Sequence, residues 1–138
     1  MPATTEIDRV LETVLYVDDL AAAERFYGEV LGLEVDSRQD GVFVFFRCGV
    51  GMLLLFEPGA AASGRRVPAH GAKGPGHACF ALPEQALDAW QARLAAAGVA
   101  IEQEAKWPRG GRSFYFRDPA GNSLELATPR IWGLPEID

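Results

Sequence analysis

The chain has 138 residues, of which 49% are hydrophobic, and this is enough apolar material for one domain to bury a core of its own. The 13 Lys and Arg residues against 19 Asp and Glu residues leave a formal net charge of −6, which disfavours nucleic acid and anionic membranes as partners. No apolar run is long enough to span a bilayer, and Cys48 and Cys79 lack the spacing of a zinc site. We therefore expect a cytoplasmic protein without a disulfide.

The first half of the chain predicts one helix among four strands. Residues Val10–Val17 are rich in β-branched and apolar side chains, which is typical of a strand. Asp18 and Asp19 are favourable helix N-caps, and the apolar residues after them recur every three or four positions, so a helix is predicted over Leu20–Leu31. Three more strands are then predicted, at Leu33–Ser37, Val42–Arg47 and Met52–Phe56.

The second half repeats this order after a linker. Residues Gly59–Gly76 are rich in glycine and show neither helical nor strand periodicity. A strand is predicted at His77–Leu82, and the apolar stripe that follows predicts a helix over Pro83–Ala97. Three further strands are expected at Val99–Ala105, Ser113–Arg117 and Ser123–Ala127, the last two joined by a tight turn of sequence DPAGN.

The repeat indicates a duplicated βαβββ module. An offset of 65 residues places Glu12 on His77 (77 minus 12), and an offset of 70 places Leu55 on Glu125 (125 minus 55). We predict a single α+β domain with modules at about 10–57 and 77–128 and a linker at 58–76. Each sheet buries one face under its helix, so the other faces are expected to form a curved mixed sheet around a cup, within one chain or between chains.

Three segments resemble the vicinal oxygen chelate superfamily, which is the glyoxalase, bleomycin resistance protein and dioxygenase family. They are ETVLYVDDLAAAERFYGEVLGL (Glu12–Leu33), GHACFAL (Gly76–Leu82) and FYFRDPAGNSLEL (Phe114–Leu126). The resemblance implies paired βαβββ modules around a cup that, in the enzymes of the family, holds a divalent metal. It also implies ligands on the first and last strand of each module. These positions here are Glu12, Leu55, His77 and Glu125, of which Leu55 cannot coordinate a metal.

Strand alternation gives an independent expectation for the same positions, because residues two apart share a face. Glu12, His77 and Glu125 are predicted to converge in the cup, where one imidazole and two carboxylates suit Mn, Fe, Co, Ni or Zn. Glu12 and Glu125 are the candidate catalytic residues, with Glu12 as the favoured base. The residues expected to line the substrate site are Tyr16, Phe45, Leu55, Arg112 and Tyr115.

Two functions fit these features. The first is a metal-dependent lyase or isomerase of the glyoxalase type, in which the metal stabilises an enediolate of a small oxygen-rich substrate. The second is a metal-free small-molecule-binding protein resembling bleomycin-resistance proteins. Dioxygenase chemistry is less favoured, because its iron sites normally use two histidines. A homodimer is expected, while the roles of His70 in the linker and of the tail 129–138 stay open.

Overall fold

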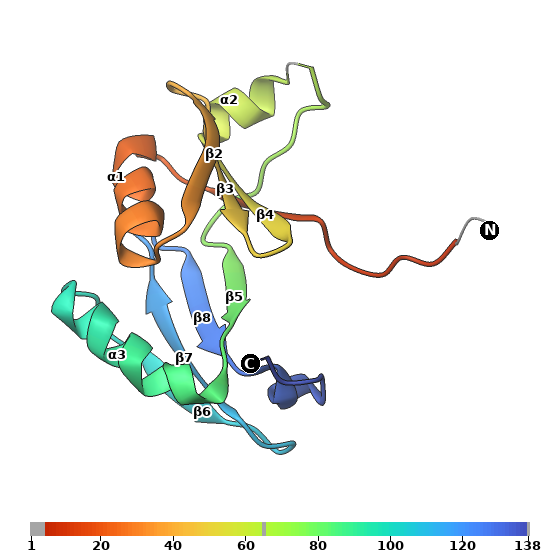
Figure 1. Ribbon diagram of the computed structural model, residues 1–138. Coiled ribbons are helices and arrows are strands. Elements are labelled where there is room, and N and C mark those ends of the chain that lie inside the picture. The colour runs from red at the N-terminus through yellow and green to blue at the C-terminus, as the bar shows by residue number, and fades with distance from the viewer. Residues whose placement is uncertain (1–4, 65, 138) are drawn as a thin grey trace.

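The chain forms two four-stranded mixed sheets, each with one helix on the same side of the molecule (Figure 1). The computed structural model describes residues 5–64 and 66–137. Sheet 1 has the strand order β1-β4-β3-β2 and sheet 2 the order β5-β8-β7-β6, so the duplicated α+β fold is confirmed. The first-module elements are β1 (Glu12–Tyr16), α1 (Leu20–Arg25), η1 (Phe26–Val30), β2 (Glu34–Gln39), β3 (Phe43–Cys48) and β4 (Gly51–Phe56).

The second module repeats the first with small differences at the element ends. Its elements are β5 (His77–Ala81), η2 (Glu84–Ala86), α3 (Leu87–Ala96), β6 (Gln103–Lys106), β7 (Arg112–Arg117) and β8 (Ser123–Ala127). The helix predicted from Leu20 has its expected length, with Asp19 as its N-cap, but its second half is the π-helical turn η1. Strand β6 starts four residues later than the predicted Val99, because Val99 and Ile101 pack against the core instead of pairing.

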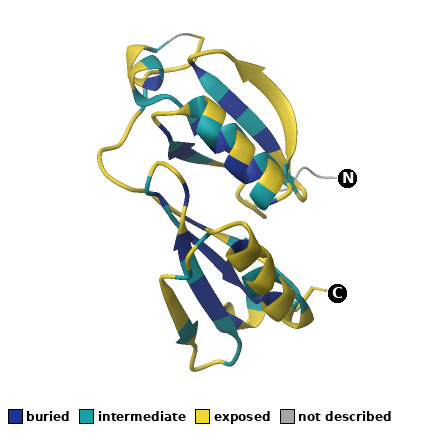
Figure 2. Cartoon of the chain, turned by 90° about the vertical axis from the view of Figure 1, so that its left-hand side faces the viewer, coloured by how far each residue is buried: buried dark blue, intermediate teal, exposed yellow. Residues whose placement is uncertain are grey.

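Side chains on the helix-facing side of both sheets form one continuous core (Figure 2). Leu15, Phe46 and Leu55 from sheet 1 join Phe116 and Leu124 from sheet 2 in the same cluster, and each is at most 3% exposed. Helices α1 and α3 both lie on this side of the molecule (Figure 1), and we refer to the opposite surfaces of the two sheets as the open faces.

A buried polar network ties the two modules together at the DPAGN turn. Tyr27 of η1 donates its hydroxyl hydrogen to Asp118 Oδ2 at 2.6 Å. Asn122 donates to the Tyr16 carbonyl oxygen at 3.0 Å and accepts from the Gly76 N–H at 2.7 Å. The turn that the sequence predicts as a local feature therefore also fixes how sheet 2 sits beside sheet 1.

Two segments contain structure that the sequence did not predict. The linker begins with a short helix, α2 (Pro58–Ser63), because the Glu57 carboxylate accepts hydrogen bonds from the N–H groups of Gly59 and Ala60. The tail begins with a 3-10 turn, η3 (Pro129–Trp132), and buries Ile131 against its own chain. No helix in the described part of the chain is long and apolar enough to cross a membrane.

Candidate functional site

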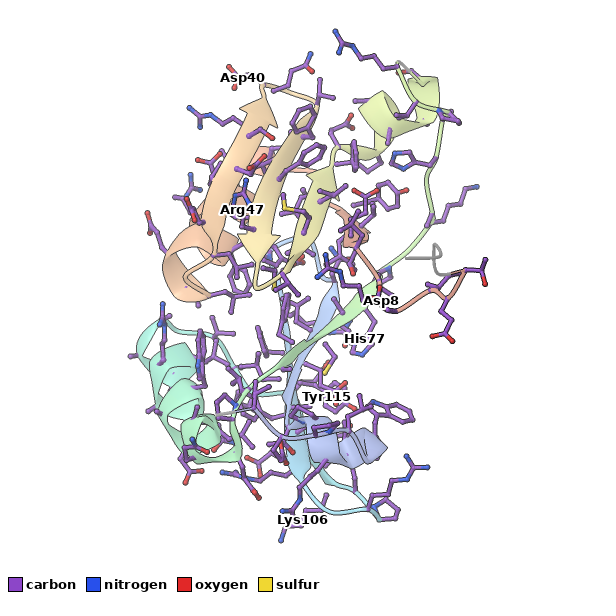
Figure 3. The ribbon with its side chains drawn as sticks, turned by 45° about the vertical axis from the view of Figure 1, so that its right-hand side comes forward. Asp8, Asp40, Arg47, His77, Lys106 and Tyr115 are labelled. Atoms are coloured by element: carbon purple, nitrogen blue, oxygen red, sulfur yellow. The ribbon has the colours of Figure 1, made fainter. Side chains whose placement is uncertain are left out.

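His77 and Glu125 meet on the open face of sheet 2, on the neighbouring parallel strands β5 and β8 (Figure 3). His77 Nδ1 lies 2.9 Å from the carbonyl oxygen of Ser123. Because a carbonyl oxygen only accepts, Nδ1 carries the ring proton and the other nitrogen, Nε2, is left to face Glu125 Oε1 at 3.3 Å. This hydrogen bond therefore sets the tautomer in which Nε2 can bind a cation.

Glu125 is a buried carboxylate, with its side chain only 7% exposed. Its second oxygen, Oε2, is buried and has no hydrogen-bond partner among the described residues. Tyr115 stacks beside His77 with ring centroids 6.0 Å apart, and burial together with the Glu125 carboxylate raises the pKa of its hydroxyl. Desolvation and the same carboxylate raise the pKa of Cys79 to about 12, so the thiol is protonated at neutral pH. The negative charge of Glu125 thus dominates this site.

Glu12 lies apart from this pair in a single chain. It begins β1, where its side chain is exposed, and it belongs to sheet 1 while His77 and Glu125 belong to sheet 2. Within residues 5–64 and 66–137, no group of three His, Cys, Asp or Glu side chains is placed to hold a metal ion. The predicted convergence of Glu12, His77 and Glu125 is therefore not made within one chain, because the open faces lie side by side rather than opposite each other (Figure 1).

The expected position of Leu55 on the open face is wrong. Leu55 is fully buried in the helix-side core, and Leu54 faces the open side. The reason is one extra residue in the second hairpin: paired positions 47 and 52 are five apart, whereas paired positions 117 and 123 are six apart. The last strands are therefore related by an offset of 71, which makes Leu54 the counterpart of Glu125 (125 minus 54). Leucine at this position still supplies no ligand.

The remaining predicted lining residues divide between the two sides of the sheets. Tyr16 and Phe45 lie on the open face of sheet 1, and Tyr115 lies on that of sheet 2. Arg112 was expected beside the site, but its guanidinium pairs with Asp88 of α3 on the helix side. Strand alternation accounts for this, because Arg112 is an odd number of residues from Tyr115 on the same strand.

His70 reaches the open face of sheet 1 from the linker. Its Nδ1 lies 2.6 Å from the hydroxyl oxygen of Tyr16, and its ring packs edge-on against Phe56 with centroids 4.6 Å apart. Nothing in the linker sequence indicates this contact, because it depends on a residue 54 positions away. The linker sequence shows a single histidine among glycines, but it does not show which residue that histidine contacts.

A divalent metal fits the residues that sheet 2 presents. With the ring proton on Nδ1, His77 Nε2 can coordinate a cation beside Glu125 Oε1. Glu125 Oε2 is buried without a hydrogen-bond partner among the described residues, although the Cys79 thiol and the Tyr115 hydroxyl interact with the same carboxylate. A carboxylate left unsatisfied in the interior is unfavourable unless a cation or a proton compensates it.

The family model for the Glyoxalase/Bleomycin resistance protein/Dioxygenase superfamily matches residues 7–126. The chain belongs to this superfamily. The match spans both modules and includes Glu12, His77 and Glu125. Members of the glyoxalase superfamily commonly use divalent metals, which agrees with the donor set on the open faces.

Solved structures of the glyoxalase superfamily have the same fold as this chain. The crystal structure of lactoylglutathione lyase from Agrobacterium tumefaciens is 44% identical, covers 93% of this chain and 98% of its own, and has a TM-score of 0.89. A glyoxalase/bleomycin resistance protein/dioxygenase from Nocardioides is 26% identical over 90% of this chain and 85% of its own, with a TM-score of 0.71. No curated protein matches the sequence. The likeness to the lyase supports a glyoxalase-type function.

Proposed function

We propose that this protein is a divalent-metal-dependent lyase or isomerase of the glyoxalase type, acting on a small substrate with neighbouring oxygen atoms. The observation that carries the proposal is the His77–Glu125 pair, in which an imidazole nitrogen without a proton faces a buried carboxylate that has one oxygen without a hydrogen-bond partner. The similarity to lactoylglutathione lyase supports the choice of reaction class. Lactoylglutathione is accordingly the first substrate to test.

The active form in this proposal is a homodimer, because the site is incomplete in one chain. His77 and Glu125 of one copy need a third ligand, and Glu12 on the open face of sheet 1 is 65 residues before His77 in the repeat (77 minus 12). A two-fold arrangement that places sheet 1 of one copy opposite sheet 2 of the other makes two equal sites. Each site then has one imidazole and two carboxylates.

The side chains of the proposed site have different roles. His77 and Glu125 hold the metal, which when bound supplies the Lewis acidity that stabilises negative charge on substrate oxygens. Glu12 of the second copy is either the third ligand or the base beside the metal. As the base, its exposed carboxylate would take a proton from the substrate carbon and return it to the neighbouring carbon. The Tyr115 ring stacks beside His77 and so forms one wall of the site.

The test uses two variants that are each inactive alone. Glu12→Gln and His77→Ala are purified separately, mixed under mild denaturation, refolded with added metal and assayed with lactoylglutathione. If each site draws Glu12 from one copy and His77 from the other, a mixed dimer regains one intact site, and equal mixing restores about a quarter of wild-type activity. Glu12→Gln mixed with Glu12→Gln is the control. No recovery on mixing contradicts a site shared between subunits.

A metal-free binding protein is the second candidate, and the leucine at the counterpart of Glu125 favours it. Elemental analysis of protein purified without a chelating column separates the two candidates. The enzyme proposal expects about one divalent ion per chain in the wild type and little in His77→Ala. Equal, weak binding of divalent ions by both proteins contradicts the enzyme and supports the binding protein.

A further inference from the structure

A chain of hydrogen bonds joins the start of β5 to the start of β8 and ends at the His77 ring. The Gly76 N–H donates to Asn122 Oδ1 at 2.7 Å, and the Ser123 N–H donates to the Gly76 carbonyl oxygen at 2.9 Å. The Ser123 carbonyl oxygen in turn accepts from His77 Nδ1 at 2.9 Å. The place of this carbonyl beside β5 therefore decides which ring nitrogen of His77 carries the proton.

The Asn122 side chain is buried, and its partners fix the orientation of its amide. The residue is 3% exposed, and Nδ2 donates to the Tyr16 carbonyl oxygen at 3.0 Å and to Asp118 Oδ2 at 2.9 Å. A backbone carbonyl only accepts and a backbone N–H only donates, so Nδ2 faces Tyr16 and Oδ1 faces Gly76. The pairing of β5 with β8 begins at His77, so Asn122 gives the residue before it an acceptor.

The first module shows that this strand pairing does not require an asparagine. There the Met52 N–H donates to the Leu11 carbonyl oxygen at 2.9 Å, which is the same bond at the start of β1 and β4. The offset of 71 between the last strands places Asn122 on Gly51 (122 minus 51), which has no side chain to accept a bond. The added acceptor is thus present in the module that begins with His77.

We infer that Asn122 is a positioning residue for His77. By holding Gly76 against β8, Asn122 keeps the Ser123 carbonyl in place to accept from Nδ1, which directs Nε2 toward Glu125. Without Asn122 the start of β5 separates from β8, and the ring proton is no longer confined to Nδ1. The inference rests on the proposed function, because a ring with its proton on Nε2 cannot bind the metal through that nitrogen.

The ring ¹⁵N chemical shifts of His77, measured by NMR in EDTA, report its tautomer without any metal. At about pH 8.5, above the ordinary histidine pKa of about 6.5, we expect mainly Nδ1–H in the wild type and both tautomers in Asn122→Ala. The chain has two histidines, so the spectrum of His70→Ala identifies the signals of His77. Calorimetry with zinc should then show about a tenfold loss of affinity in Asn122→Ala.

Two further variants separate the tautomer of His77 from the stability of the protein. Asn122→Asp keeps an oxygen for the Gly76 N–H but places a second carboxylate beside Asp118, so it should be less stable and still favour Nδ1–H. Tyr27→Phe removes the 2.6 Å bond to Asp118 but no bond to Gly76. It should lose stability and keep the wild-type tautomer. A merely structural role of Asn122 would not give this pattern.

Either of two results in folded variants would overturn the inference. One is a wild-type tautomer in Asn122→Ala, and the other is a shift in Tyr27→Phe as large as that in Asn122→Ala. If Asn122→Ala does not fold, Asn122→Gly copies the first module, and rapid hydrogen exchange of the Gly76 amide in the wild type would also overturn the inference. Absence of zinc binding by the wild type, with the expected tautomers, contradicts the proposed function alone.

Discussion

Leu54 and Leu55 are neighbours on β4 that face opposite sides of sheet 1. Leu54 is on the open face with Glu12, whereas Leu55 is fully buried against the helix side. Substitutions at these two positions therefore test which side of β4 faces the proposed metal site. The same substitution at both positions is a matched pair.

We predict that Leu54→Glu strengthens divalent-metal binding, because it supplies the carboxylate that sheet 1 lacks at the counterpart of Glu125. We expect a gain of about tenfold or more in affinity, measured by calorimetry, after the cost of placing a carboxylate in a site that is 8% exposed. Leu55→Glu is the control and should lower the free energy of unfolding by about 4 kcal/mol or more, since its charge enters the core unpaired. Unchanged metal affinity in a folded Leu54→Glu protein would contradict the assigned site.

The DPAGN turn connects β7 to β8 and also makes hydrogen bonds to the first module. Asp118 accepts from its own turn, from the Asn122 N–H at 2.9 Å, and also from the hydroxyl of Tyr27 in the other module. Tyr27 is fully buried, and its burial together with the Asp118 charge strongly raises the pKa of its hydroxyl. The turn therefore couples a local structure to a contact 91 residues away.

This coupling predicts a loss of stability in alkali that Tyr27→Phe reduces. A tyrosine in the unfolded chain ionises near its ordinary pKa of about 10, whereas Tyr27 in the folded protein resists ionisation. The contribution of the Tyr27 hydroxyl to the free energy of unfolding is therefore complete below about pH 10 and declines as the pH rises further. Tyr27→Phe should cost about 1.5 kcal/mol at neutral pH and then lose less stability than wild type above pH 10, as measured by urea unfolding. An equal loss of unfolding free energy above pH 10 in the wild type and in Tyr27→Phe would contradict this role of Tyr27.

In the whole molecule, both open faces lie on the side away from α1 and α3 (Figure 1), and exposed apolar residues line a groove beside His77. Val10, Leu11 and Val50 are 77%, 59% and 79% exposed, and they line one groove together with His77 and Cys79. An apolar rim beside an incomplete ligand set is what a subunit interface would cover.

Leu11→Lys is accordingly predicted to weaken both the proposed dimer and the proposed metal site. The added charge enters the proposed interface, so sedimentation should shift toward the 14.9 kDa monomer and metal affinity should fall in the same samples. Val67→Lys is the control, since Val67 is 57% exposed in the linker, close to the value for Leu11. Loss of dimer with full metal affinity would show that one chain is sufficient to hold the ion.

The duplicated modules and the strands that carry the candidate ligands are predictable from the amino-acid sequence alone. These features follow from periodicity and turn chemistry, which act over a few residues, and the family motifs around Glu12, His77 and Glu125 add to them. The pairing of His77 with Glu125 was also predictable, because both follow from their places on the first and last strands of one module.

The positions of Glu12, Leu54 and His70 relative to His77 and Glu125 depend instead on long-range contacts. The hairpin between β7 and β8 has one residue more than the hairpin between β3 and β4. Because side chains alternate between the two faces of a strand, the counterpart of Glu125 on the open face is Leu54 and not Leu55. The linker brings His70 to Tyr16 through contacts that no local pattern encodes. The shared core holds the two sheets side by side, and this long-range packing is why one chain leaves Glu12 apart from His77 and Glu125.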